Sequence, residues 1–248
     1  MQRSAAEAAR AALDAYAAPG RSALVRIRTA GVEWEGGVDP DRPYPAASLL
    51  KLGIAIAVEG GISDGRIDPD TVIAVQELSA RPDEHSVLDL LDPSTILRLS
   101  DALALMIGAS DNTCARWLSA VVGNVDDPNA ARTSLTTCRE ALDLLRTAAD
   151  HQHYPITAHA LRRSIRNSRI PLGATDTDVS IAHKTGSLAG LAHDVAIIEC
   201  DSGVAEFAFL TDQQHDTLVT GYAMGICTRE VLTAWGLAAR STVSVDGE

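Results

Sequence analysis

The order of two sequence patterns along the chain is the strongest constraint on its fold. Strand patterns lie near both ends: Val25 and Ile27 alternate with arginines, and apolar runs cover 179–184, 193–200 and 205–211. The stretch between them is mainly helical in pattern. Because strands from both ends need partners, the pattern predicts one antiparallel sheet built from both ends of the chain, with a helical subdomain between them.

The expected helices complete this arrangement. One covers 4–16 and ends near Pro19-Gly20, and a hairpin is expected around Gly31. Further helices are expected over 49–58, ending at Gly60-Gly61, then over 94–107, 113–122, from Ser134 onward, over 155–165 and over 217–239. The predicted fold class is therefore α+β, an α/β/α sandwich within one unit spanning 1–248. Its sheet and terminal helices come from 1–45 and 172–248, and its helical subdomain from 46–171.

Composition excludes several classes of partner. The net charge is −12 and hydrophobic residues make up 46% of the chain, which disfavours nucleic acid and anionic membranes as partners. No apolar stretch is long enough to span a membrane. Glu7 and Asp14 interrupt any leader-like run at the N-terminus, so a cytoplasmic enzyme of small-molecule or secondary metabolism is expected, or a secreted or periplasmic one if a leader was removed. The oligomeric state stays open.

Cysteine and histidine spacing gives no sign of a metal or other cofactor. The four cysteines lie in apolar runs without CxxC spacing, which favours buried free thiols over disulfides. His151 and His153 have no third ligand at convincing spacing, so they predict a polar loop. We therefore expect no cofactor and a small-molecule substrate.

Lysine is confined to two positions, Lys51 and Lys184, in a chain with 19 arginines (21 Lys+Arg minus 2). Arginine stays protonated in proteins, whereas a desolvated lysine beside another cation can become neutral and act as a base. Lys51 follows Ser48 by three residues, and Lys184 opens Lys184-Thr185-Gly186. The two lysines therefore mark positions where amine chemistry is needed.

Three short motifs occur in order: Ser48-x-x-Lys51, Ser110-Asp111-Asn112 and Lys184-Thr185-Gly186. Helical spacing puts the Ser48 hydroxyl and the Lys51 amine on one face, at a helix start that favours negative charge. Ser48 is therefore the expected nucleophile and Lys51 its base, while Ser110 is expected between the two lysines as a proton relay.

The remaining motif residues are expected to bind substrate. Asn112 would offer its amide to the acyl side chain or to Lys51. The hydroxyls of Thr185 and Ser187, beside Gly186, would hold a carboxylate or carbonyl together with Lys184. The backbone N–H groups of Ser48 and Ser187 would form the oxyanion hole.

This set of motifs resembles that of class A β-lactamases and penicillin-binding proteins. The resemblance extends to 87–93 and 105–107 before Ser110, and to 187–196 after the last motif. It implies the β-lactamase/transpeptidase-like fold and an active-site-serine acyl hydrolase that forms an acyl-enzyme on Ser48. The substrate would be a β-lactam, ester, thioester or amide. The alternatives are an acyltransferase or transpeptidase with the same site, and a penicillin-binding or interaction protein without turnover.

One element of the family pattern is missing. Class A enzymes carry a Glu-x-x-x-Asn element between the second and third motifs, and its glutamate activates the deacylating water. Here Glu140 is the only glutamate between Asn112 and Lys184, it lies in a helical pattern, and the omega-loop region is shortened to 123–129. The sequence therefore predicts intact acylation, impaired hydrolysis and a cleft with one wall open.

Other polar residues near the motifs have weaker assignments. His85 lies where related enzymes place a loop at the cleft edge, so it is a candidate substrate contact or replacement base, although a solvated loop histidine is favoured. Asp126 and Asp127 are candidate substitute bases in a setting typical of a turn. Asp111 is expected to cap a helix, and His183 to pack on the sheet face opposite Lys184.

Overall fold

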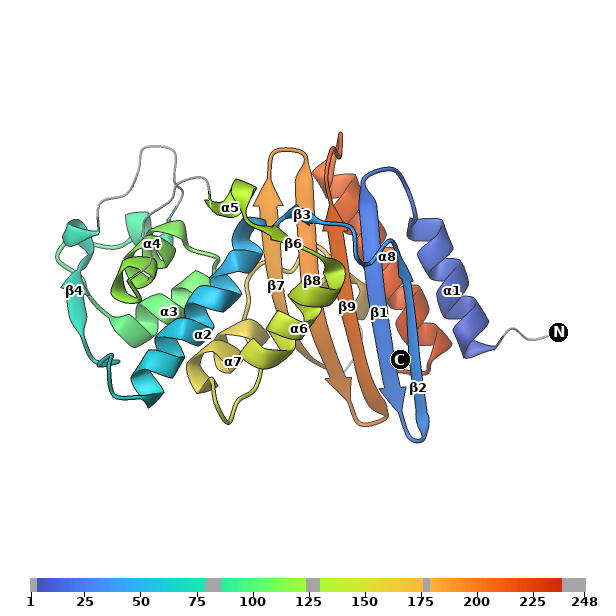
Figure 1. The fold of residues 1–248 in the computed structure, drawn as a ribbon, viewed down its shortest axis with the longest axis horizontal. Helices are drawn as coiled ribbons and strands as arrows, with labels where there is room; N and C mark the ends of the chain where they lie inside the picture. Colours follow the sequence, from blue (N-terminus) through green and yellow to red (C-terminus); the bar gives the residue numbers. More distant parts are fainter. Residues whose placement is uncertain (1–3, 79–85, 124–129, 176–178, 238–248) are drawn as a thin grey trace, which may run out of the picture.

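A five-stranded antiparallel sheet forms the centre of the protein in this computed structural model, which describes residues 4–78, 86–123, 130–175 and 179–237 (Figure 1). The strand order is β2-β1-β9-β8-β7. The strands are β1 (Arg21–Thr29), β2 (Val32–Val38), β7 (Ser180–Leu188), β8 (Leu191–Cys200) and β9 (Gly203–Thr211). N-terminal β1 pairs with C-terminal β9, so both ends of the chain build the sheet as the sequence predicts.

The sheet separates two hydrophobic cores. Helices α1 (Ala5–Tyr16) and α8 (Thr217–Ala234) lie side by side on one face (Figure 1) and share a core with alternate residues of the strands, including Val25 and Phe207. The opposite core joins residues such as Leu24 and Ala208 to the helical half of the molecule. Alternation along each strand thus produces the α/β/α layers, which confirms the predicted fold class.

The helical half carries the remaining elements. The longer helices are α2 (Leu50–Ser63), α3 (Leu99–Gly108), α4 (Asn112–Val121), α6 (Cys138–Ala148) and α7 (Pro155–Arg162). Short helices are η1 (Ala47–Leu49), η2 (Val75–Glu77), η3 (Val87–Leu90), α5 (Ala130–Thr133) and η4 (Ile170–Ala174). Two small ribbons pair β3 (Tyr44–Pro45) with β6 (Leu135–Thr136), and β4 (Val72–Ala74) with β5 (Ile96–Arg98).

Several predicted helix boundaries were wrong. Helix α7 ends at Arg162 and not at 165, and α8 ends at Ala234 and not at 239. The helix expected from residue 94 begins at Leu99, because Ile96–Arg98 pairs with β4 instead. The helix expected from Ser134 begins after Thr137, whose side chain caps it, and Leu135 is an exposed strand residue. Helix α2 continues through Gly60-Gly61 to Ser63, and the absence of a side chain at Gly61 leaves room for Ile67. At the starts of α3 and α6 a tertiary contact overrides the local signal.

One buried carboxylate fixes helix α7 on α2. Glu59 is only 4% exposed, and its side chain accepts hydrogen bonds from the backbone N–H groups of Ile156 (2.9 Å) and Thr157 (2.8 Å). These are N–H groups of the first turn of α7, which have no partner within the helix. Glu59 therefore acts as a long-range cap that sets the position of α7 under the sheet edge.

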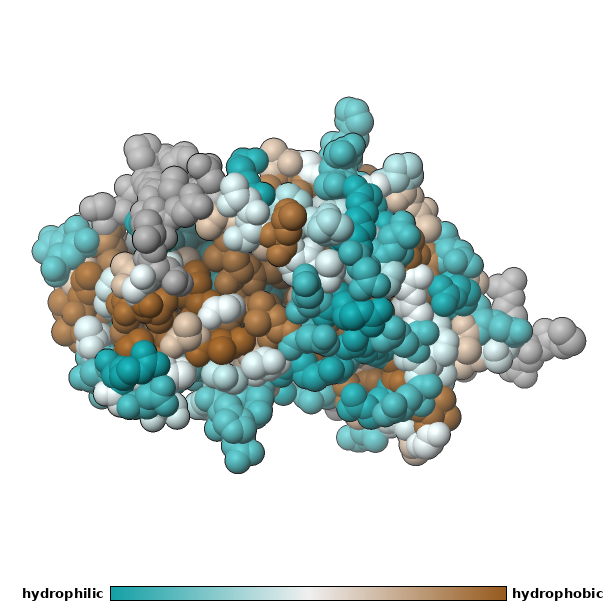
Figure 2. All heavy atoms as spheres, viewed as in Figure 1, coloured by the Kyte–Doolittle hydropathy of each residue, from teal (hydrophilic) through white to brown (hydrophobic). Residues whose placement is uncertain are grey.

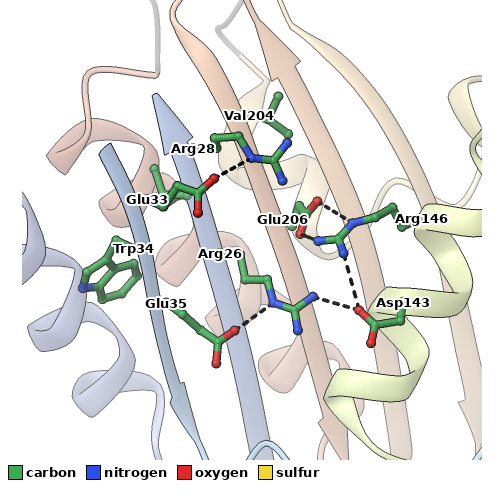
Figure 3. A pocket seen from close by; sticks show the side chains of 10 residues that line it. Arg26, Arg28, Glu33, Trp34, Glu35, Asp143, Arg146, Val204 and Glu206 are labelled. Atoms are coloured by element: carbon green, nitrogen blue, oxygen red, sulfur yellow. Dashed lines mark hydrogen bonds and ion pairs between the residues drawn. The ribbon is translucent and has the colours of Figure 1, made fainter. Parts of the chain in front are cut away.

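Ion pairs fix helix α6 on the sheet. They line a surface hollow of about 600 Å³ over β1, β2, β9 and α6 (Figure 3). Arg146 of α6 binds both oxygens of Glu206 on β9, at 3.1 and 2.5 Å, and Arg26 of β1 bridges Glu35 and Asp143. Because these charges neutralise one another, we interpret this hollow as a structural joint.

Polar and apolar side chains separate on the visible surface. Figure 2 shows hydrophilic residues over α6 and the outer strands, and hydrophobic residues over α2, α3 and α4. Within the described ranges, no helix has the length and apolar character needed to cross a membrane. The four cysteines are free thiols, and Cys114, Cys138 and Cys227 are buried.

Candidate active site

The segment that precedes Ser48 is held from several sides. β3 pairs with β6, and the N–H of Ala46 donates to the carbonyl of Ser134 at 2.7 Å. Ala47 has a φ of +49°, a left-handed conformation that is costly for a residue with a side chain. This strained backbone places half-buried Ser48 in the short helix η1, which leads directly into α2.

Strand β7 lies directly against this segment. A side-chain carbon at Gly186 would come within 3.1 Å of the Ala47 Cβ, so glycine permits the close approach. The ring of His193 on the adjacent strand β8 donates from Nε2 to the carbonyl of Pro45 at 2.8 Å. The Lys-Thr-Gly motif and the Ser48 segment therefore face each other across a narrow gap, although they lie far apart in sequence.

His193 makes this contact as a neutral ring. Its Nδ1 accepts a hydrogen bond from the N–H of Thr211 at 3.1 Å while Nε2 donates to Pro45, which defines one tautomer. Burial lowers its pKa to about 4. The ring therefore stays uncharged at neutral pH and holds β8 to the segment that precedes Ser48.

Lys51 binds the second motif. It is 4% exposed, and its Nζ donates to the carbonyl of Ser110 at 2.6 Å and to Oδ1 of Asn112 at 2.7 Å, with Oγ of Ser110 at 3.4 Å. The backbone of Ser110 is also left-handed, with φ +60°. Strain at this residue directs both its carbonyl and its hydroxyl into the site.

Lys184 approaches the same hydroxyl from the sheet. Its Nζ donates to Oγ of Ser110 at 2.8 Å and to the carbonyl of Thr185 at 2.9 Å. Burial and the charge of Lys51 hold the pKa of Lys184 well below its ordinary value. The structure thus places Ser110 between the two lysines, in the arrangement expected from the sequence.

Arg169 is a cation of this site that the sequence did not reveal. It precedes η4, and its guanidinium donates to the carbonyls of Gly186 (2.9 Å) and His193 and to Oγ of Ser187 (2.6 Å). Ser187 is exposed, so the guanidinium lies at the open end of β7. In a chain with 19 arginines (21 Lys+Arg minus 2), no local pattern distinguishes this one.

The other polar residues have structural contacts. Asp111 accepts from the N–H of Cys114 and from Ser86, so it caps α4 as predicted. His183 is buried as expected, but its ring is hydrogen-bonded to Asp194 and is not simply packed. His85, Asp126 and Asp127 lie outside the described residues. Within the described part of the chain, no group of three His, Cys, Asp or Glu side chains is placed to hold a metal ion.

Comparison with known proteins identifies the family. The model of the family described as "Beta-lactamase enzyme family" matches residues 5–235, which is most of the chain. The chain belongs to the β-lactamase enzyme family. Membership of this family makes it a β-lactamase-like hydrolase. No curated protein matches it.

Solved structures show how this β-lactamase-family fold recurs. A PBP-A mutant, solved as an acyl-enzyme complex with penicillin G, is 18% identical, with a TM-score of 0.76 over 94% of this chain and 96% of that one. The β-lactamase from Sphaerobacter thermophilus is 24% identical, with a TM-score of 0.78 over 94% and 98%. A class A β-lactamase from Bacteroides cellulosilyticus is 17% identical, with a TM-score of 0.76 over 94% and 99%. Identities this low establish the fold alone.

This β-lactamase-family chain differs from the class A sequence pattern between its second and third motifs. The sequence has no Glu-x-x-x-Asn element between Asn112 and Lys184. The short helix α5 and strand β6 stand between α4 and α6, and α5 lies next to η1. Glu140, the one glutamate in this interval, caps the start of α6 through the N–H of Thr137 at 3.0 Å and serves no site role there.

Proposed function

We propose that the chain is an active-site-serine acyl hydrolase that forms an acyl-enzyme on Ser48. The acyl donor is a β-lactam, ester, thioester or amide. The observation that carries the proposal is the position of Ser110 Oγ, 2.8 Å from Lys184 Nζ and 3.4 Å from Lys51 Nζ. Folding alone does not require a hydroxyl between two buried amines. That position suits proton transfer.

Acylation follows from these positions. The Ser48 hydroxyl attacks the carbonyl carbon of the donor and loses its proton to a neutral Lys51 amine. The backbone N–H groups of Ser48 and Ser187 hold the oxyanion. The bond from the carbonyl carbon to the leaving nitrogen, oxygen or sulfur then breaks. Ser110 donates its hydroxyl proton to the leaving group and regains a proton from Lys51, which thereby returns to its neutral form.

Lys184 of β7 and Arg169 of the loop before η4 favour a donor that carries an anionic group. Lys184 and Arg169 flank the hydroxyls of Thr185 and Ser187, and Arg169 binds Ser187 Oγ at 2.6 Å. A carboxylate at the end of β7 gains hydrogen bonds from these hydroxyls and the attraction of both cations. Small acyl donors with a carboxylate are therefore the preferred substrate class.

Release of the acyl group is the slower half of the proposed reaction. The glutamate that activates water in class A enzymes has no counterpart in the interval between Asn112 and Lys184. This absence favours a long-lived acyl-enzyme, as in a penicillin-binding protein, and it leaves the acyl group open to transfer to an amine or alcohol. Turnover that rises when such acceptors are added identifies the acyltransferase alternative.

Intact-protein mass spectrometry tests the proposal. The chain is mixed with penicillins, cephalosporins and activated esters, and we expect a stable mass increase equal to the acyl group. The increase is lost in Ser48→Ala and kept in Ser63→Ala, which alters a serine at the far end of α2, the helix that follows η1. Absence of an adduct with every donor, or an adduct that persists in Ser48→Ala, would refute the proposal.

A further inference from the structure

One buried carboxylate lies behind the candidate site and contacts both segments that carry its sheet-side cations. Asp194 on β8 is 0% exposed. Its Oδ2 accepts from the N–H of Ile170 at 3.0 Å, and its Oδ1 is 3.1 Å from Nδ1 of His183. Ile170 directly follows Arg169, and His183 directly precedes Lys184.

The contacts continue from the imidazole back to the loop. Nε2 of His183 lies 3.1 Å from Oδ1 of Asn167, in the same loop as Ile170. The loop is therefore tied to β8 through the N–H of Ile170 and to β7, the Lys184 strand, through Asn167. On its other side, the guanidinium of Arg169 binds the carbonyls of Gly186 and His193.

We propose that Asp194 is a positioning residue of the acylation site, which fixes the Arg169 loop and the Lys184 strand in register with each other. The inference rests on the proposed function, because it assigns Asp194 a role through Lys184 and Arg169. No contact of Asp194 with the substrate is involved. A buried carboxylate without partners is costly, so its two contacts hold the segments firmly.

The charge of Asp194 has a second effect. Lys184 faces Lys51 from α2, Ser110 from the loop before α4, and Arg166 and Arg169 from the loop before η4. Burial, Lys51 and these arginines lower the pKa of Lys184, whereas Asp194 raises it. Asp194 thereby favours the protonated form of Lys184, which donates to Ser110 Oγ.

Nuclear magnetic resonance can test this effect without any substrate. Lysine labelled with carbon-13 at Cε gives two side-chain signals, because the chain has only Lys51 and Lys184, and Lys51→Arg assigns them. In Asp194→Asn we expect the Lys184 signal to titrate at a lower pH than in the unaltered protein, because the carboxylate that raises the pKa of Lys184 is gone. Glu206→Gln removes another buried sheet carboxylate, far from Lys184 in the ion-pair joint, and leaves the titration unchanged.

The acylation rate provides the second readout. We expect the alkaline limb of its pH profile to move down with the Lys184 titration in Asp194→Asn and to stay in place in Glu206→Gln. The inference is overturned if folded Asp194→Asn shows neither a shifted Lys184 titration nor a shifted alkaline limb of the acylation profile. It is also overturned if Asp194→Asn and Glu206→Gln show equal shifts. Absence of acylation in the unaltered protein overturns the proposed function and this role with it, so the two failures are distinguishable.

A second variant covers the case in which Asp194→Asn does not fold. His183→Gln keeps the carboxylate but removes the imidazole between it and Asn167. We expect the donor concentration at half-maximal acylation to rise several-fold while the Lys184 titration stays in place, because the Arg169 loop loses one tie. An unchanged half-maximal concentration, or a titration shifted as in a charge removal, contradicts the proposal.

Discussion

At the scale of single residues, the chemistry of the site depends on using lysine only where it is needed. Both lysines are buried and meet at one serine hydroxyl, while arginines serve the surface ion pairs. A guanidinium cannot give up its proton, so a base at this site has to be an amine. Burial and the charge of Lys51 hold the pKa of Lys184 well below its ordinary value.

Replacement of Lys51 by arginine tests the base directly. In Lys51→Arg we expect acylation at least about 100-fold slower, because the guanidinium can still donate to Ser110 and Asn112 but cannot accept the Ser48 proton. The rate of adduct formation measures the effect. Thermal unfolding of the variant serves as the control for its fold, and acylation at the unaltered rate would contradict the role of Lys51.

The sequence was sufficient for the motif residues and insufficient for their supports. Ser48, Ser110 and Lys184 could be predicted because short spacings and an unusual lysine distribution mark them. Arg169 and Asp194 could not, because each acts through contacts with residues 11 or more positions away. Such long-range contacts leave no local periodicity or composition signal.

At the scale of elements, His193 can accept the N–H of Thr211 and donate to Pro45 at the same time only while its ring is neutral. Its pKa is lowered from 6.5 to about 4 by burial. Below the ordinary pKa, the unfolded chain therefore binds more protons than the folded one, and stability falls as pH drops through this window. Above the window the histidine has no such effect.

The resulting prediction concerns stability in mild acid. Between about pH 7 and pH 4.5, we expect the unaltered protein to lose roughly 2 to 3 kcal/mol of unfolding free energy more than His193→Gln does, since glutamine has no proton to gain. Urea unfolding of both proteins at the two pH values measures the difference. Equal losses in the two proteins would show that His193 is not held neutral.

The cap of α7 gives a second prediction at this scale. Glu59→Gln replaces one of the two accepting oxygens with an N–H donor that opposes the N–H of Ile156 or Thr157. We expect a loss of about 1 to 3 kcal/mol in unfolding free energy. Glu33→Gln, at a side chain 82% exposed, is the matched control and should change stability little. An equal loss of unfolding free energy in Glu33→Gln and Glu59→Gln would contradict the assignment of Glu59 as the cap of α7.

The element boundaries show the same division between local and distant causes. The pattern of α6 is visible from Cys138 onward, but Leu135 also fits its apolar face and belongs to β6, because β3 provides a strand partner there. Likewise, β5 forms before α3 because β4 lies beside it. Pairing between short strands that are distant in sequence determines where α3 and α6 begin. Helical periodicity gives no information about such pairing.

At the scale of the whole molecule, the joint between α6 and the sheet links the helical half to the strands. In Arg146→Met, the carboxylate of Glu206, 5% exposed, loses both hydrogen bonds. We expect a loss of about 1 to 2 kcal/mol, reduced by the solvent access of Arg146. Arg28→Met in the same hollow, where Arg28 is 57% exposed, should cost less than about 0.5 kcal/mol. Denaturant unfolding measures both losses. Similar losses in the two variants would contradict a stabilising role of the Arg146–Glu206 ion pair.

The pairing of β1 with β9 also governs when the molecule can become active. Thr29 pairs with Gly203, so the N-terminal hairpin leaves the ribosome long before its partner strand is made. Contacts this distant in sequence slow folding and leave a strand edge exposed in the meantime. The Ser48 side of the site is synthesised early and the Lys184 side late. We therefore expect nascent chains truncated before β7 to be inert toward acyl donors and dependent on chaperones until the last strand emerges.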